Sequence, residues 1–189
     1  MSTLLKEILK YNDKFVEEQK YVPYLTSKFP ERKLVLITCM DTRLIELLPA
    51  SMNLKNGDVK IIKTAGAVVS HPFGSVMRSI LVAIYELNAE EVFVVGHYDC
   101  GMGSVNPRAM KEKFIKQGIK EETINTLEYS GMDLERWLQG FDCVADSVKN
   151  SVSMIRHHPL LPNKVPVHGL VMDPSTGRLD VIDDGYTHI

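Results

Sequence analysis

Two short runs of consecutive apolar residues, 34–37 and 92–96, constrain the fold of this chain more than any other feature of its sequence. A strand that is apolar on both faces is buried on both faces, as in a parallel sheet covered by helices. Weaker strand patterns occur at 59–63 and 167–172, and a turn signal then precedes a further short strand at 179–182. The sequence therefore predicts an α/β fold, with a mainly parallel central sheet of four strands and a C-terminal antiparallel strand.

Amphipathic patterns lie before and between the predicted strands and indicate helices. Apolar residues at helical spacing occur at 2–19, at 74–87 and from about 142 to 157. Because strands that alternate with helices are joined by right-handed crossovers, helices are expected on both faces of the sheet. Residues 103–140 are charged and mixed, which predicts short surface helices and loops. We therefore expect residues 1–189 to form a single domain.

Composition excludes several classes of partner. The chain carries 22 basic and 24 acidic residues, which gives a formal charge of −2 and no electrostatic footprint for nucleic acid. No apolar stretch approaches the ~20 residues that cross a bilayer, and the N-terminal residues lack a signal-peptide core. Three cysteines are an odd number and argue against a disulfide framework. We expect a cytoplasmic protein that acts on a small molecule and has no nucleic-acid or membrane partner.

Metal-binding residue types follow two of the predicted strands. Cys39 follows the first apolar run, and His97 and Cys100 follow the second. The carboxyl ends of neighbouring parallel strands lie about 4.8 Å apart, so these three side chains can converge at one edge of the sheet. Zinc prefers thiolate and imidazole ligands, and three protein ligands leave a fourth position open. The sequence predicts one zinc ion per subunit, although either thiol taken alone is more typical of a buried core cysteine than of a metal ligand.

Asp41 and Arg43 follow the first of these residues, Cys39, and share one side of an extended segment. Two arrangements of this pair are expected. If Asp41 binds the metal as a fourth ligand, the site is closed. If Arg43 holds the carboxylate in a bidentate pair, the fourth position opens to water. An ordinary surface ion pair is the alternative to both.

The pattern Cys-x-Asp-x-Arg at 39–43, followed by His-x-x-Cys at 97–100, resembles the zinc signature of the β-class carbonic anhydrases, in a short, prokaryotic-type form. The resemblance extends to Ala65-Gly66 and to Gly101-Met102, and it covers residues 33–105 most specifically. Many members of the family carry Arg-Asn before Ala-Gly, whereas this chain has Lys63-Thr64. The substrate pocket is therefore expected to differ from that of those members.

The resemblance implies an activity and a role for each site residue. The activity is the reversible hydration of CO₂ to bicarbonate and a proton. Cys39, His97 and Cys100 correspond to the zinc ligands of the family, and Asp41 and Arg43 correspond to its catalytic dyad. In this mechanism zinc lowers the pKa of a bound water, and the resulting hydroxide attacks CO₂.

Two other functions fit the same metal ligands. A related enzyme would hydrolyse carbonyl sulfide or carbon disulfide, and a non-catalytic protein would use zinc for stability, with Asp41 closing the site. In the β-class family the N-terminal helix commonly packs on a partner subunit. For residues 2–19 the resemblance therefore implies the same packing, and a homodimer or a multiple of it.

The remaining candidate residues are expected to be structural. His157 and His158 are adjacent on a helix and therefore point in different directions. His168 lies within a predicted buried strand and is expected to be a hydrogen-bonded core residue. An isolated thiol such as Cys143 usually packs, and Trp137 is expected to fill the core.

Overall fold

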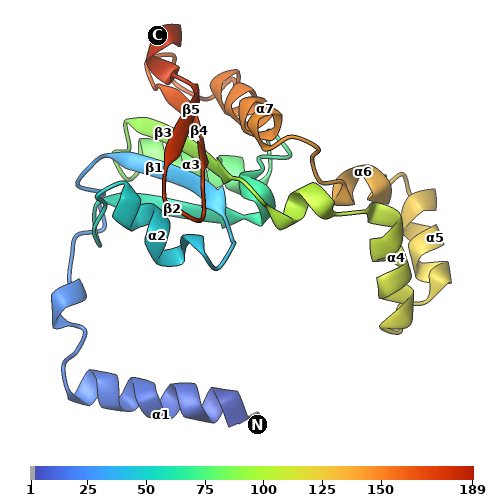
Figure 1. Ribbon diagram of the computed structural model, residues 1–189, viewed down its shortest axis with the longest axis horizontal. Coiled ribbons are helices and arrows are strands. Elements are labelled where there is room, and N and C mark those ends of the chain that lie inside the picture. The colour runs from blue at the N-terminus through green and yellow to red at the C-terminus, as the bar shows by residue number, and fades with distance from the viewer. Residues whose placement is uncertain (1–2) are drawn as a thin grey trace.

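The computed structural model describes residues 3–189, and a five-stranded sheet lies at its centre (Figure 1). The strands lie in the order β2-β1-β3-β4-β5, and all but the last pair are parallel. Their bounds are β1 (Leu34–Cys39), β2 (Val59–Thr64), β3 (Glu91–His97), β4 (Val167–Met172) and β5 (Leu179–Asp183). The prediction of four parallel strands followed by one antiparallel strand is confirmed.

Alternate residues of β1 contribute to two separate hydrophobic cores. Val35 and Ile37 pack in the core formed with α3 (Ser75–Tyr85) and α7 (Val144–Arg156). Leu36 faces the other way and packs in the core formed with α2 (Leu44–Ser51). All three side chains are 0% exposed, and burying each contributes roughly 1.5–3 kcal/mol. Helices therefore cover both faces of the sheet, as the buried apolar runs predict.

Two glycines let α7 lie directly against the sheet. A Cβ atom on Gly96 would lie 2.9 Å from Cγ2 of both Val144 and Val148. A Cβ on Gly169 in β4 would lie 2.8 Å from Cγ1 of Val148 and 3.1 Å from Cγ2 of Val152. Real Cβ atoms are essentially never found within 3.0 Å of another atom, so a side chain at either position would push α7 away from the sheet. Helix α7 therefore packs directly against the carboxyl end of β3.

The sequence patterns did not reveal α2 (Leu44–Ser51), which begins directly after Arg43. This helix has only 8 residues, so its periodicity is too short to stand out, and Pro49 within it argues against a helix. Tertiary packing decides the structure here, because Leu44 and Leu48 are each 1% exposed in the second core. The helix anchors the segment that follows β1.

Residues 103–140 form the short helices that the sequence predicts, and these helices project from the sheet (Figure 1). The helices are α4 (Pro107–Lys116), α5 (Glu121–Tyr129) and α6 (Leu134–Leu138). Asn106 and Asp133 cap the amino ends of α4 and α6, and Nζ of Lys111 lies 2.9 Å from Oε1 of Glu128, which joins α4 to α5. The prediction that Trp137 fills the core is wrong, because α6 covers no part of the sheet and this ring is 69% exposed.

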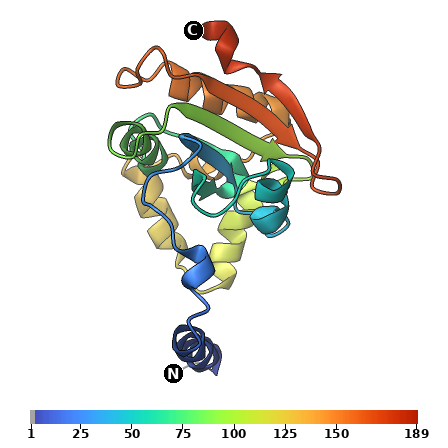
Figure 2. The same ribbon diagram turned by 90° about the vertical axis from the view of Figure 1, so that its left-hand side faces the viewer.

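The N-terminal helix α1 (Thr3–Glu17) lies apart from the sheet, and the short helix η1 (Val22–Tyr24) lies between them (Figures 1 and 2). The amphipathic pattern predicted a helix over 2–19, and residue 2 lies outside the described residues. The helix ends before residue 19 because Gln19 adopts a left-handed φ of 53°. No residue of α1 is buried. Among the described residues, no helix has the length and apolar character needed to span a membrane.

Candidate metal centre

Cys39 is the last residue of β1, and its side chain is 5% exposed. The loop after the neighbouring strand β2 reaches this thiol through Gly66, whose amide nitrogen lies 3.4 Å from Sγ of Cys39. Gly66 lies in η2 (Ala65–Ala67) with a φ of 72°, and a Cβ there would lie 2.8 Å from the ring of Phe141 and 2.9 Å from Cγ of Met102. Glycine is therefore required where the backbone donates to the thiol.

His97 is the last residue of β3 and is 0% exposed. Its Nδ1 atom lies 2.8 Å from the carbonyl oxygen of Tyr98, so Nδ1 carries the proton and donates it to that oxygen. The lone pair of Nε2 is therefore directed to the opposite side of the ring. Nε2 is buried and has no hydrogen-bond partner among the described residues. Buried polar atoms normally have a partner, so this nitrogen is placed for a ligand.

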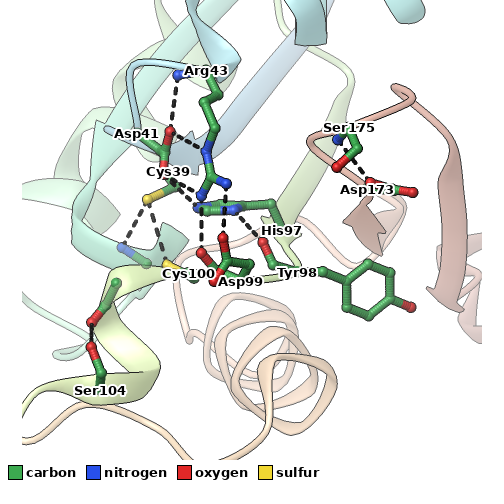
Figure 3. Close-up of polar contacts among 12 residues, drawn as sticks. Cys39, Asp41, Arg43, His97, Tyr98, Asp99, Cys100, Ser104, Asp173 and Ser175 are labelled. Atoms are coloured by element: carbon green, nitrogen blue, oxygen red, sulfur yellow. Dashed lines mark hydrogen bonds and ion pairs between the residues drawn. The ribbon is translucent and has the colours of Figure 1, made fainter.

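The third side chain of the cluster is Cys100, which follows β3 by three residues. Its Sγ lies 3.8 Å from Sγ of Cys39, and the ligand atoms of Cys39, His97 and Cys100 all lie within 4.8 Å of one another (Figure 3). Zinc–sulfur bonds of about 2.3 Å in tetrahedral geometry place two sulfurs roughly 3.8 Å apart, so the spacing fits this metal. Burial raises the pKa of the Cys100 thiol to about 11. A metal ion at the cluster would reverse that effect, since coordinated thiols are deprotonated.

Arg43 holds the carboxylate of Asp41 in a bidentate pair. Nε of Arg43 donates to Oδ1 at 3.0 Å and Nη2 donates to Oδ2 at 2.9 Å, while the backbone amide of Arg43 adds a third bond to Oδ1 at 2.9 Å. These hydrogen bonds lower the pKa of Asp41 to about 2. Oδ2 of Asp41 lies 3.7 Å from Nε2 of His97, so the paired carboxylate faces the cluster rather than bulk water. This geometry corresponds to the arrangement expected for an open fourth position.

Asp99 is the residue of this site that the sequence reasoning missed. Nη1 of Arg43 donates to Oδ2 of Asp99 at 2.9 Å, and Nη2 donates to its carbonyl oxygen at 2.9 Å. The contact depends on a φ of 53° at Asp99, a left-handed conformation that no periodic pattern predicts. The available signal was its position between the two candidate ligands His97 and Cys100, where a turn must bring both side chains to one point.

The other histidines lie outside the cluster, which is the one such group of metal-binding side chains found among residues 3–189. His168 is 6% exposed, accepts a hydrogen bond from the amide of Gly185 at 3.1 Å, and packs against the rings of Phe93 and Tyr186. Its Nε2 has no hydrogen-bond partner in the described part of the chain, so the expected hydrogen bonding is only half present.

Two further residues differ from each other in exposure and both lie apart from the cluster. His158 is 4% exposed and packs edge-on against the ring of Phe73, with a centroid distance of 5.2 Å. Cys143 occupies the N-cap position of α7, makes no capping hydrogen bond with its side chain, and is exposed. The prediction that Cys143 packs is therefore wrong.

A Cys₂His cluster beside an ion-paired carboxylate, at the carboxyl edge of a parallel sheet, defines a candidate α/β metalloenzyme. The family model for carbonic anhydrase matches residues 34–179. The chain is 59% identical over 186 residues to YtiB, a proposed carbonic anhydrase of Bacillus subtilis (strain 168), covering 98% of this chain and 100% of that protein.

Comparison with solved structures agrees with the family match. The crystal structure of β-carbonic anhydrase isoform I from Trichomonas vaginalis has a TM-score of 0.87 and 36% identity, covering 98% of this chain and 100% of that chain. This chain belongs to the β-carbonic anhydrase family. It is also 27% identical over 160 residues to a carbon disulfide hydrolase of Acidianus sp. (strain A1-3), covering 78% of this chain and 76% of that protein.

Proposed function

We propose that this protein is a zinc-dependent carbonic anhydrase that catalyses the reversible hydration of CO₂ to bicarbonate and a proton. The observation that carries the proposal is the carboxylate of Asp41, which Arg43 holds bidentately with Oδ2 3.7 Å from the unpartnered Nε2 of His97. An acceptor that faces the ligand atoms while paired elsewhere is suited to orient a nucleophile beside the metal.

The zinc ion would be held by Sγ of Cys39, Nε2 of His97 and Sγ of Cys100, one ion per subunit. Bound zinc supplies the Lewis acidity that makes water a nucleophile at neutral pH. The orphaned Nε2 atom and the 3.8 Å separation of the two sulfurs support this ligand set. The carbonyl of Tyr98 fixes the imidazole in the tautomer whose Nε2 lone pair is free. Metal-bound histidines are commonly oriented in this way by a hydrogen bond from their other ring nitrogen.

Asp41 and Arg43 have separate tasks in this proposal. Because the pKa of Asp41 lies at about 2, its carboxylate stays ionised at working pH and acts only as a hydrogen-bond acceptor. It therefore orients a donor such as the attacking water and rejects a group that offers only acceptors. Arg43 keeps the carboxylate from serving as a ligand, which leaves the fourth position of the metal for the reaction.

A related hydrolase of carbonyl sulfide or carbon disulfide is the second candidate function. The 27% identity to the carbon disulfide hydrolase of Acidianus sp. (strain A1-3) favours it, because that relative acts on a different substrate. A non-catalytic protein in which Asp41 closes the zinc site is less well supported, because Arg43 already occupies both oxygens of that carboxylate.

Stopped-flow measurement of CO₂ hydration by the purified protein, with and without a zinc chelator, separates these functions. A carbonic anhydrase hydrates CO₂ rapidly and loses that activity in the chelator, and zinc restores it. A hydrolase is slow with CO₂ and releases sulfide from carbon disulfide. A protein that is silent with both substrates, while containing one zinc per subunit, would contradict the enzymatic proposals.

We also propose that the protein is a homodimer or a multiple of it, in which α1 packs on a partner subunit, and that it acts in the cytoplasm. Leu4, Ile8 and Val16 of α1 are 63%, 55% and 54% exposed, which leaves apolar surface available for a second copy. A reducing compartment keeps Cys39 and Cys100 as thiols, the form that binds metal.

A further inference from the structure

The guanidinium of Arg43 connects the two segments that carry the metal-binding side chains. Two of its nitrogens, Nε and Nη2, donate to the carboxylate of Asp41, which follows β1. Nη1 donates to the side chain of Asp99 and Nη2 also donates to its carbonyl, and Asp99 follows β3 (Figure 3). All three nitrogens of the guanidinium are therefore engaged, and its plane is fixed from two sides.

We propose that Asp99 is a positioning residue that holds Arg43 and, through Arg43, keeps Asp41 away from the metal. The inference rests on the proposed function, because it assigns a device that keeps the same zinc site open. A planar guanidinium that is anchored at one end only can swing out with its flexible side chain. The second anchor at Asp99 removes that motion.

Solvent competes for the hydrogen bonds of Arg43, because its side chain is 41% exposed and that of Asp99 is 86% exposed. The carbonyl oxygen of Asp99 therefore accepts a second bond from Arg43, beside the one that its carboxylate accepts. If Arg43 left, the carboxylate of Asp41 would face Nε2 of His97 at 3.7 Å with no other cation to hold it. A free carboxylate at that position is a zinc ligand, and the fourth coordination position would close.

The backbone at position 99 supports the same role. Asp99 has a φ of 53°, in the left-handed region that aspartate, asparagine and glycine adopt more readily than other residues. This conformation turns the carbonyl of Asp99 toward Arg43 at 2.9 Å and lets Cys100 turn back toward the cluster. Strain placed between two ligand residues is commonly tied to the site that they form.

Two variants separate the carboxylate from the backbone conformation. Asp99→Gly removes the carboxylate and keeps the left-handed backbone, whereas Asp99→Asn keeps the backbone preference and one neutral acceptor. Asn88→Gly is the matched control, because Asn88 is exposed, has a φ of 59° and lies before the opposite end of β3. Any general effect of placing glycine in a left-handed position appears in the control as well.

The readouts are the rate of zinc release to a chelator and the rate of CO₂ hydration. In Asp99→Gly we expect hydration to slow by about three- to tenfold while zinc release also slows, because Asp41 joins the metal. Asp99→Asn should lie between this variant and the wild type, and Asn88→Gly should match the wild type. A merely structural role would speed zinc release.

Zinc release that is unchanged or faster in Asp99→Gly overturns the inference, whatever the hydration rate. Asp41→Asn combined with Asp99→Gly should abolish the slowing of zinc release, and persistence of the slowing would also overturn it. Absence of CO₂ hydration in the wild type contradicts the proposed function alone, because the release measurement does not depend on turnover.

Discussion

Nε2 of His97 lies 3.7 Å from Oδ2 of Asp41, where the segments that follow β1 and β3 meet. The nitrogen is buried and has no hydrogen-bond partner among the described residues, while the oxygen is already paired with Arg43. A buried polar atom without a partner costs about 1–3 kcal/mol. A metal ion bound between the two atoms would therefore give Nε2 of His97 the partner that it lacks, and it would lie beside the ionised carboxylate of Asp41.

The cysteines offer a matched test of the metal ligands. We expect Cys100→Ser to lose zinc, because its Sγ lies 3.8 Å from Sγ of Cys39 in the cluster. Since the partners behind a ligand are alone worth about 10–100-fold in affinity, loss of a ligand should cost at least about 100-fold. Metal analysis after dialysis measures the effect. Cys143→Ser, at an exposed position outside the cluster, should keep its zinc, and equal zinc in both variants would contradict the ligand assignment.

A change at Asp41 should separate metal binding from turnover. Asp41→Asn keeps the shape of the side chain but replaces an ionised acceptor by a neutral amide, so we expect zinc to remain bound and turnover to fall by about 100-fold. Stopped-flow hydration and metal analysis on the same sample report the two effects. Asp146→Asn, at an exposed position of α7, is the control and should retain full turnover. Loss of zinc in Asp41→Asn would show that the carboxylate is a ligand.

Gly96 should resist even the smallest side chain. A Cβ there would lie 2.9 Å from Cγ2 of Val144 and of Val148, so Gly96→Ala must push α7 away from β3. Overpacking of this kind costs about 1–3 kcal/mol of unfolding free energy. Denaturant unfolding measures the loss. Gly103→Ala is the control, because the nearest atom to its added Cβ would lie at 3.6 Å, and a similar loss in both variants would argue against the steric explanation.

The sheet and the metal cluster could be predicted from the sequence because their signals are local. The apolar runs that became β1 and β3 are buried on both faces, and chain direction then places the residues after them at one edge. The convergence of Cys39 and His97 follows from parallel pairing, whereas Cys100 reaches the cluster through the turn at Asp99. The observed geometry adds the bidentate form of the Asp41–Arg43 pair, which the sequence left open between two arrangements.

The features that the sequence did not reveal depend on tertiary context. Helix α2 forms despite Pro49 because Leu44 and Leu48 are buried in the second core, and a proline inside so short a segment hides the helix from sequence patterns. Trp137 is exposed because α6 belongs to the projecting helices, whose placement no residue pattern specifies. The role of Asp99 depends on one left-handed φ angle, which is a property of the folded turn.

The stability of the fold should decrease as the pH falls from about 7 to about 5, in part because of His168. Burial lowers the pKa of His168, with Glu91, Asp184 and Asp183 opposing the shift and Arg156 adding to it. In the unfolded chain a histidine titrates near pH 6.5, so below that pH the unfolded state binds more protons than the folded state. The free energy of unfolding therefore rises with pH across this window.

Replacement of His168 should remove that contribution. We expect His168→Asn to show a smaller difference in unfolding free energy between pH 5 and pH 7.5 than the wild type, as measured by urea denaturation at the two pH values. Comparing each protein with itself cancels the cost of the substitution that is common to both pH values. His157→Asn, at the exposed carboxyl end of α7, is the control and should keep the wild-type difference. An unchanged difference in His168→Asn would assign the pH dependence to other groups.

The apolar stripe of α1 should control the oligomeric state. Ile8 is 55% exposed on a helix in which no residue is buried, so a charge at this position harms the isolated subunit little and opposes packing on a second copy. We expect the wild type to have the mass of a dimer or larger by light scattering at micromolar concentration, and Ile8→Asp to dissociate to a smaller species. Lys10→Glu changes charge on the opposite side of α1 by helical spacing and should leave the mass unchanged. A wild-type monomer, or an Ile8→Asp variant of unaltered mass, would contradict the proposed packing of α1.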